Sequence, residues 1–303
     1  MGTAILLLAV IASSQITDVE KDLKKHIKND TLEGWTSGGM LSLTFAQVSL
    51  TNWAAGGQNS ISINGLANMY INYLKGNTGW ENRLDLGYGI QKQGKENNWI
   101  KMDDKIELMS KYGRKAAKYW YYSALLSFKS QMTPGYNYPD DSTKISNFLS
   151  PGYILAAIGM DFKTSNNFSA FIAPFTAKIT IVNDKNLSDI GAFGVDSGKT
   201  FRSEYGGYIR IFYKKNIQEN ITIQSKLDLF SNYLHNPQNI DINWEALLTI
   251  KISKLITMNL STTLLYDDDI KVPVDRNDDG IAESEGVRTQ FKEVLGIGFS
   301  YNF

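Results

Sequence analysis

The sequence predicts an all-β fold: an antiparallel transmembrane β-barrel of about 12 strands, with short periplasmic turns and longer extracellular loops. Two observations lead to this prediction. From residue 38 to residue 303, apolar and polar residues alternate with a period of two, which is typical of β-strands. Along the chain, short connections between these segments alternate with longer ones. Because no run of about 18 apolar residues occurs, a helical membrane protein is excluded.

Residues 1–14 are predicted to be a secretory signal peptide. An apolar run over residues 4–12 is followed by Ser13 and Ser14, which are small residues of the type found at signal-peptidase cleavage sites. No basic residue precedes the run. A buried core segment is the alternative interpretation.

Residues 15–35 are predicted to form a periplasmic N-terminal segment, followed by the barrel over residues 36–303. Thr17 and Glu20 fit the capping box of a short amphipathic helix. Such a helix could fold into the barrel mouth, contact another envelope protein or remain loosely docked.

Twelve segments carry the apolar–polar alternation. In residues 242–252, for example, Ile242 and Trp244 fall on one face, whereas Asn243 and Glu245 fall on the other. Most segments are longer than the ~9–11 residues that a tilted strand needs to cross a bilayer. The predicted strands are residues 38–51, 59–74, 79–92, 100–112, 118–132, 151–163, 167–182, 200–214, 221–234, 241–253, 257–268 and 288–303.

The connections divide the predicted sheet into two different ends. One end has the tight links 75–78, 113–117, 164–166, 215–220 and 254–256, and the other has the long links 133–150, 183–199 and 269–287 with three intermediate ones. This asymmetry is typical of outer-membrane barrels, in which the short turns face the periplasm. We therefore predict a bacterial outer-membrane protein that contacts outer-membrane lipid.

The apolar face of the strands is predicted to contact that lipid. Its members include Ile61, Ile63, Leu84, Leu86, Phe171, Ala173, Phe175 and Ala177. Two acids that break the pattern, Asp104 and Glu293, fall near strand ends on the long-loop side. Pro174 falls in the middle of a predicted strand and cannot donate to the hydrogen-bond ladder, so a β-bulge is expected there.

The opposite face carries charges of both signs and is predicted to line the lumen. A soluble barrel would place apolar residues there, and a twelve-stranded interior is wider than the ~8-strand size that side chains alone can fill. The predicted lumen charges are Glu81, Arg83, Asp85, Lys101, Asp103, Lys105, Glu107, Arg202, Glu204, Arg210, Lys226, Asp228, Glu245 and Lys251. The same face includes Asp161, Lys178 and Lys292.

The last predicted strand ends in a regular alternation of apolar residues. These residues are Leu295, Ile297, Phe299, Tyr301 and the terminal Phe303. The pattern resembles the C-terminal signature that the barrel-assembly machinery of Gram-negative bacteria recognises, so this machinery is a predicted partner. Any amphipathic last strand is the alternative interpretation.

Several stretches resemble a porin-like family of Bacteroidota outer-membrane barrels known only as a domain of unknown function. They are residues 34–39 (GWTSGG), 47–60 (QVSLTNWAAGGQNS), 103–108 (DDKIEL), 233–234 (YL) and 265–270 (LYDDDI). The resemblance implies an outer-membrane location. It brings no known activity, so no functional residue is transferred from it.

The last long loop contains a partial calcium-binding pattern. Oxygen ligands fall at the first, third, fifth, seventh and ninth positions of a calcium loop, namely Asp275, Asn277, Asp279, Ile281 through its carbonyl and Glu283. Gly280 supplies the turn, but Gly286 stands where a bidentate Glu is needed. The pattern predicts at best a weak Ca²⁺ site, the only cofactor that the sequence suggests; a solvated acidic loop is the alternative.

Little in the sequence predicts catalysis. The chain has no Cys and two His, which excludes thiolate metal sites and Cys nucleophiles. His235 and the acids at 267–269 match an outer-membrane protease poorly, and no Ser has the spacing of a lipase site. We therefore predict no enzyme and no catalytic residue. The balance of 31 basic and 31 acidic residues gives no general attraction to nucleic acid.

The first functional hypothesis is a porin-like channel for small polar solutes, because the predicted lumen is polar and charged. The alternative is a non-conducting structural or accessory subunit of an outer-membrane complex with envelope protein partners, and the third is a membrane-embedded hydrolase. Whether the loops 133–150 and 183–199 fold inward would distinguish the first two.

Overall fold

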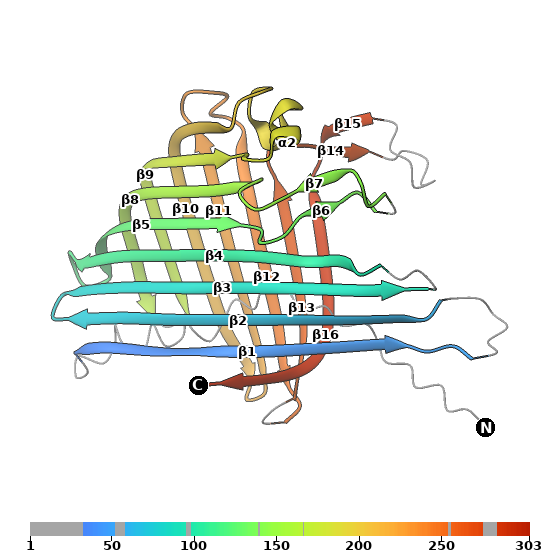
Figure 1. Ribbon diagram of the computed structural model, residues 1–303. Coiled ribbons are helices and arrows are strands. Elements are labelled where there is room, and N and C mark those ends of the chain that lie inside the picture. The colour runs from blue at the N-terminus through green and yellow to red at the C-terminus, as the bar shows by residue number, and fades with distance from the viewer. Residues whose placement is uncertain are drawn as a thin grey trace.

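Twelve antiparallel strands form a closed barrel in the computed structural model, which confirms the predicted fold (Figure 1). The model describes residues 33–51, 58–94, 98–138, 140–165, 167–253, 256–274 and 284–303. The signal-peptide prediction and most of the predicted periplasmic segment lie outside these residues. Among the residues described, no helix is both long and apolar enough to cross a membrane.

The barrel strands follow the predicted segments closely. They are β1 (Gly34–Val48), β2 (Ser60–Lys75), β3 (Thr78–Gln93), β4 (Ile100–Lys115), β5 (Trp120–Ser130), β8 (Gly152–Ser165), β9 (Phe168–Ile181), β10 (Phe201–Gln218), β11 (Ile221–Asn232), β12 (Ile240–Lys251), β13 (Ile256–Tyr266) and β16 (Gln290–Asn302). Each strand pairs with its neighbour along the chain, and β16 returns to pair with β1.

Closure of the ring depends on Phe303 and on Gly39 of β1. Gly39 and Phe303 exchange two backbone hydrogen bonds of 3.0 Å. A Cβ at Gly39 would lie 2.6 Å from the Asn68 carbonyl oxygen and 2.7 Å from the Phe303 ring, so only glycine fits this close approach. The apolar residues of the predicted assembly signal from Leu295 to Tyr301 alternate along β16, and Phe303 follows the strand; all five side chains are exposed.

The predicted difference between the two ends of the barrel is present. One end, the short-turn end, has connections such as 76–77 and 219–220, and the other, the long-loop end, carries all the long connections. The long loops contain two small hairpins, β6 (Gly135–Tyr136) with β7 (Lys144–Ser146) and β14 (Lys271–Val274) with β15 (Ser284–Val287). They also contain the short helices α2 (Lys185–Asp189) and η1 (Ala192–Gly194).

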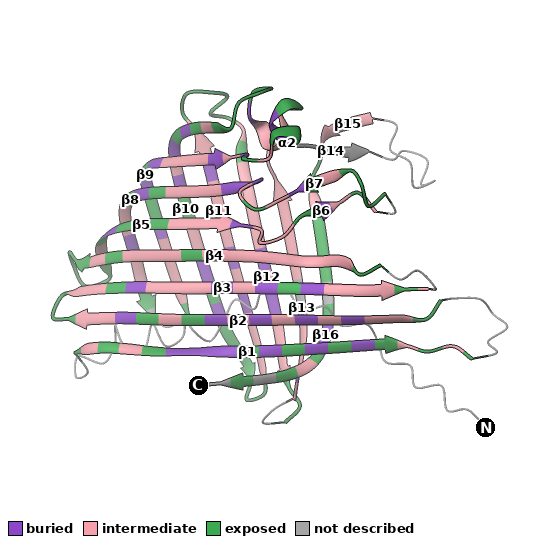
Figure 2. Cartoon of the chain, in the orientation of Figure 1, coloured by how far each residue is buried: buried purple, intermediate pink, exposed green. Residues whose placement is uncertain are grey.

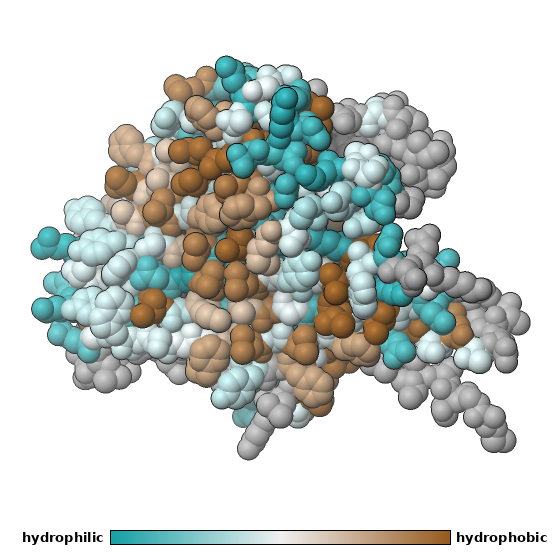
Figure 3. Space-filling model, viewed as in Figure 1, coloured by the Kyte–Doolittle hydropathy of each residue, from teal (hydrophilic) through white to brown (hydrophobic). Residues whose placement is uncertain are grey.

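The two faces of the wall differ as a membrane barrel requires. Along β1, Ser42 and Thr44 are buried, whereas Leu41 and Leu43 are 46% and 58% exposed. Figure 2 shows the resulting alternation of buried and other positions along the strands. Figure 3 shows hydrophobic side chains gathered over the middle of the wall, with hydrophilic ones toward the long-loop end.

The bulge expected at Pro174 is present, and it changes the alternation of β9. The pairing of β9 with both neighbours skips Pro174, since Ala173 faces Tyr208 and Thr176 faces Gly206 on β10. After the bulge Phe175 is 76% exposed, as predicted. Before it, Phe171 and Ala173 are buried inside the barrel, so their predicted place on the lipid face is wrong. The extra residue moves the preceding side chains to the other face.

Candidate functional site

The lumen is the candidate functional site, because its charged side chains form ion-pair networks between strands. Nearest the short-turn end is a ring of four charges, in which two lysines each contact two carboxylates. Lys111 lies 3.1 Å from Glu81 and 2.9 Å from Asp161, and Lys163 lies 3.1 Å and 3.2 Å from the same two acids. We call these residues of β3, β4 and β8 the four-charge ring.

Further ion pairs occupy the middle of the lumen. Arg83 binds Asp85 at 2.6 Å, and Lys105 binds Glu107 at 2.8 Å. Lys226 binds Glu245 at 2.8 Å on the opposite side of the ring. Lys226 also acts electrostatically on Glu107, so these charges of the two walls interact across the lumen.

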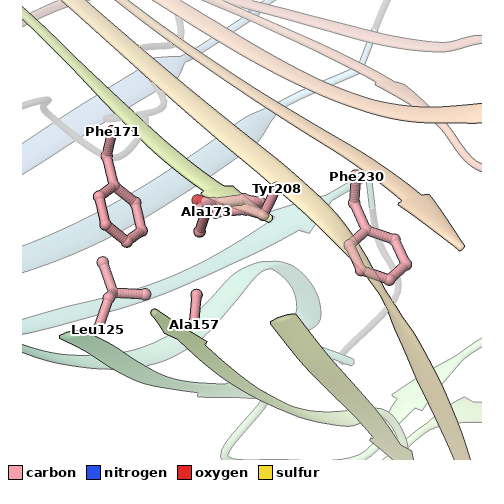
Figure 4. Packing of buried hydrophobic residues seen from close by; sticks show 6 residues of the cluster. All are labelled: Leu125, Ala157, Phe171, Ala173, Tyr208 and Phe230. Atoms are coloured by element: carbon pink, nitrogen blue, oxygen red, sulfur yellow. The ribbon is translucent and has the colours of Figure 1, made fainter. Parts of the chain in front are cut away.

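An apolar cluster fills the lumen beside these pairs. Its six buried members are Leu125, Ala157, Phe171, Ala173, Tyr208 and Phe230, and Met109 and Leu155 pack against them (Figure 4). Figure 4 shows Phe171 and Leu125 facing each other from different strands. Polar contacts fix its edge, since Asp228 accepts hydrogen bonds from the Tyr208 hydroxyl and the Arg210 guanidinium, both at 2.6 Å.

One contact shows that the barrel is flattened at this level. Neighbouring strands lie about 4.8 Å apart and tilt by about 40°, so a circular ring of twelve would be roughly 24 Å across. Arg210 on β10 and Met109 on β4 are four places apart in the ring, yet Nη1 and Sδ are separated by only 3.3 Å. Side chains of facing walls therefore meet and narrow the lumen.

A second network, which we call the mouth cluster, bridges the long-loop end. Lys178 of β9 lies 2.6 Å from Asp241, 3.3 Å from Asp267 and 3.6 Å from Glu204. Arg202 of β10 binds Glu204 and Asp269 and donates to the Gly194 carbonyl oxygen of η1. Since Asp267 and Asp269 follow β13, the cluster joins strands that are three and four places apart in the ring.

The loops 133–150 and 183–199 are held to each other at this end. Asp184 caps α2 and accepts hydrogen bonds from Lys144 Nζ at 2.7 Å and Asn147 Nδ2 at 3.1 Å. The hydrogen bond and charge of Lys144 hold the pKa of the Asp184 carboxyl below its usual range. A small core of Val182, Leu187 and Val195 packs beneath α2.

The predicted lumen charges are located as follows. Glu81, Arg83, Asp85, Lys105, Glu107, Arg202, Glu204, Arg210, Lys226, Asp228 and Glu245 take part in the networks above. Asp103 lies 3.9 Å from Lys292, and Lys251 is exposed at the short-turn end of β12. Lys129 and Lys163 are inner-face residues that the prediction omitted, although each continues the alternation of its strand.

Lys101 is misplaced in the prediction. A bulge near Met102 makes Asp103 pair with Gly89 and Lys101 pair with Ile90, which belongs to the outer face. Lys101 binds Asp104 at 3.0 Å, and Asp104 accepts two backbone hydrogen bonds of 2.8 Å from Met132 and Thr133. The pattern-breaking acid Asp104 is thus neutralised on the outer wall by Lys101 and the loop that covers both.

The predicted calcium site, from Asp275 to Glu283, lies outside the described residues. Within the part that the structure does describe, no group of three or more acids and histidines is arranged to hold a metal ion. His235 contacts Asn236, whereas the neighbouring acids bind elsewhere: Asp267 to Lys178 and Asp268 to Asn239. The geometry therefore offers no argument for the hydrolase hypothesis.

Comparison with known proteins gives a partial family match. Residues 45–136 match the model of a family described as a protein of unknown function, DUF3078, which covers less than a third of the 303-residue chain. This segment includes, in full, two of the stretches that carry the family resemblance, residues 47–60 and 103–108. No curated protein sequence matches the chain.

Several solved structures are similar to this chain at low sequence identity and low TM-score. The translocator domain of the autotransporter NalP from Neisseria meningitidis has 9% identity and a TM-score of 0.37, over 96% of this chain and 98% of that one. An outer membrane channel from Pseudomonas putida F1 has 9% identity and a TM-score of 0.43, over 90% and 96%. Outer membrane phospholipase A from Escherichia coli has 11% identity and a TM-score of 0.39, over 93% and 96%.

Proposed function

We propose that the protein is an outer-membrane β-barrel that passes small polar solutes through a lumen narrowed by its own side chains, rather than an open diffusion pore. The observation that carries this proposal is the contrast between the two faces of the wall. The inner face holds networks of paired charges, and the outer face is apolar and exposed. A soluble barrel has the opposite arrangement.

The outer face supports the membrane part of the proposal. Leu126 is 53% exposed, Phe175 76% and Phe299 65%, and they belong to an apolar belt far larger than a water-soluble monomer exposes. Aromatic pairs gather toward the short-turn end, including Trp35 with Tyr73 at 4.9 Å and Trp120 with Phe162 at 4.8 Å between ring centroids. Such rings suit a membrane interface.

The signal-peptide pattern, the apolar alternation from Leu295 to Phe303 and the resemblance to Bacteroidota barrels support the outer membrane of a Gram-negative cell as the location. In this orientation the short-turn end faces the periplasm and the mouth cluster faces the exterior. A solute entering from outside then meets the mouth cluster first and the four-charge ring last.

Conductance across planar lipid bilayers tests the proposal. The full-length barrel should conduct weakly, because paired side chains occupy much of the lumen. The double variant Asp267→Asn, Asp269→Asn removes two acids that tie the loop after β13 to Lys178 and Arg202, so we expect its conductance to rise severalfold. The matched control is Asp189→Asn with Asp196→Asn, which makes the same charge change at exposed positions of the loop 183–199.

The second candidate is the non-conducting structural or accessory subunit, and the mouth cluster is the observation that favours it. If neither the natural protein nor the Asp267/Asp269 variant conducts while both are folded, the channel proposal fails and this candidate stands. A rise in conductance with the control variant as well would show that surface charge, and not the mouth cluster, limits passage.

A further inference from the structure

A cavity of about 420 Å³ lies in the lumen toward the long-loop end. Its walls come from two opposite parts of the ring, β4, β5 and β8 on one side and β12, β13 and β16 on the other. Its polar lining includes Lys105, Lys129, Tyr153, Asn243, Gln290 and Lys292. Its volume falls in the range of about 300–1,000 Å³ that is usual for small-molecule sites.

The cavity lining carries three lysines and two aspartates, and one of these aspartates, Asp104, is bound to Lys101 outside the lining. Lys105 is neutralised by Glu107 at 2.8 Å, and Lys292 lies 3.9 Å from Asp103. Lys129 stands directly opposite Glu107 on the neighbouring strand, but that carboxylate is bound to Lys105. Glu107 and Glu245 act on the Lys129 ammonium electrostatically, but these acids form their ion pairs with Lys105 and Lys226. Among the described residues, none forms a hydrogen bond or an ion pair with Lys129, so it is the cation of the cavity without an ion-pair partner of its own.

Neutral polar groups surround this cation. Tyr153 is the direct partner of Lys129 across the β5–β8 ladder, so both side chains project from the same face of the wall. Across the cavity, the Asn243 Oδ1 atom is buried and has no hydrogen-bond partner in the described part of the chain. Gln290 adds a second amide to the same wall. The cavity therefore offers one free cation, a hydroxyl donor and two amides.

We propose that this cavity, which we call the Lys129 site, binds a small oxyanion, a carboxylate or a phosphate, from a solute that also carries hydroxyl groups. An ammonium that is partly withdrawn from bulk water and has no carboxylate bound to it is unfavourable, and a bound oxyanion supplies that direct partner. The hydroxyl of Tyr153 and the amides of Asn243 and Gln290 fit the polar remainder of the solute. This inference rests on the proposed function in one respect: if the barrel is a channel, the Lys129 site identifies the class of solute that passes through it.

Binding is tested directly on the folded full-length barrel in detergent by isothermal titration calorimetry. The probes are gluconate and inorganic phosphate, and sorbitol is the neutral match for gluconate. Binding of either anion, with none of sorbitol, is expected for the natural protein. Lys129→Met should lower the affinity at least tenfold, and Lys129→Arg should keep most of it.

Lys199→Met is the matched control, because it removes the same charge from an exposed position at the same end of the barrel. Heat-modifiable migration on gels verifies that each variant is folded. Binding of gluconate alone shows that the hydroxyl groups contribute, and binding of both anions shows that the oxyanion suffices; both results support the site. Binding of neither anion, or equal binding by natural protein and Lys129→Met, overturns it.

The outcome is separable from that of the conductance test. Anion binding without conductance leaves the Lys129 site standing and removes the channel. Conductance without anion binding removes the site and leaves the channel.

Discussion

Replacing one carboxylate of the four-charge ring should destabilise the barrel strongly. In Glu81→Gln, the two lysines Lys111 and Lys163 would share the single carboxylate of Asp161. The Glu81 side chain is only 12% exposed, so water compensates little of the lost charge. Breaking a buried ion pair by removing one partner costs about 3–5 kcal/mol, and a glutamine that still accepts a hydrogen bond brings the expected loss toward about 3 kcal/mol.

A double variant tests whether the four charges stabilise the barrel cooperatively or as independent ion pairs. If Lys163→Met is added to Glu81→Gln, one charge of each sign is gone and Lys111 still faces Asp161 at 2.9 Å. We expect the double variant to lose less stability than the two single variants together, by about 1–3 kcal/mol.

Denaturant-induced unfolding of the full-length barrel in detergent, followed by the fluorescence of its six Trp, measures these values. The control Glu219→Gln makes the same change in the exposed turn between β10 and β11 and should stay within about 0.5 kcal/mol of the natural protein. Stability of Glu81→Gln equal to that of the control, or strict additivity in the double variant, would refute the reasoning.

Three further predictions concern closure, assembly and the loops. Gly39→Val should prevent closure, since its Cβ would lie 2.6 Å from the backbone carbonyl oxygen of Asn68, and the folded form should vanish on heat-modifiability gels. Gly65→Ala, where a Cβ meets nothing within 4 Å, should leave closure unchanged. Deleting Phe303 should abolish outer-membrane insertion while synthesis continues, and normal levels in membrane fractions would contradict this. Lys144 depresses the pKa of Asp184, so the contact between Asp184 and Lys144 should persist as pH falls through the ordinary Asp pKa of about 3.9 and be lost only below it. Pepsin cleavage within residues 183–199 should accelerate once the contact is lost. The variant Asp184→Asn should show no such pH step.

Strand number, connection lengths and most inner-face residues could be predicted from the sequence, because a period of two assigns every side chain to a face once the register is known. Side chains assigned to the wrong face, in either direction, all lie next to β-bulges. The irregularity near Met102 moved Lys101 to the outer wall, and the one at Pro174 moved Phe171 and Ala173 into the lumen. A proline within a strand predicts a bulge from the sequence, whereas nothing in the local sequence around Met102 predicts one.

The partners of the lumen charges could not be predicted in the same way. Lys163 and Glu81 come from strands three places apart in the ring, and Arg210 and Met109 from strands four apart. Such contacts depend on how the barrel is flattened, and flattening is a property of the whole closed sheet. The apolar cluster around Phe171 has the same origin, because it needs side chains of several strands to converge.

The two ion-pair networks differ in burial, and this difference sets the order in which the lumen should open. In the mouth cluster Arg202 and Asp269 are 20% and 29% exposed, although Glu204 is buried, whereas no side chain of the four-charge ring is more than 15% exposed. Salt screens exposed pairs much more than buried ones. Raising the salt from 0.1 M to 1 M, which shortens the Debye length from about 10 Å to about 3 Å, should therefore loosen the mouth cluster and leave the ring intact. Single-channel conductance should then rise more steeply than the conductivity of the bath. In the Asp267→Asn, Asp269→Asn variant, which already lacks these ion pairs, the conductance should rise only in proportion to the conductivity of the bath. The same steep rise in both proteins would place the salt-sensitive step elsewhere in the lumen.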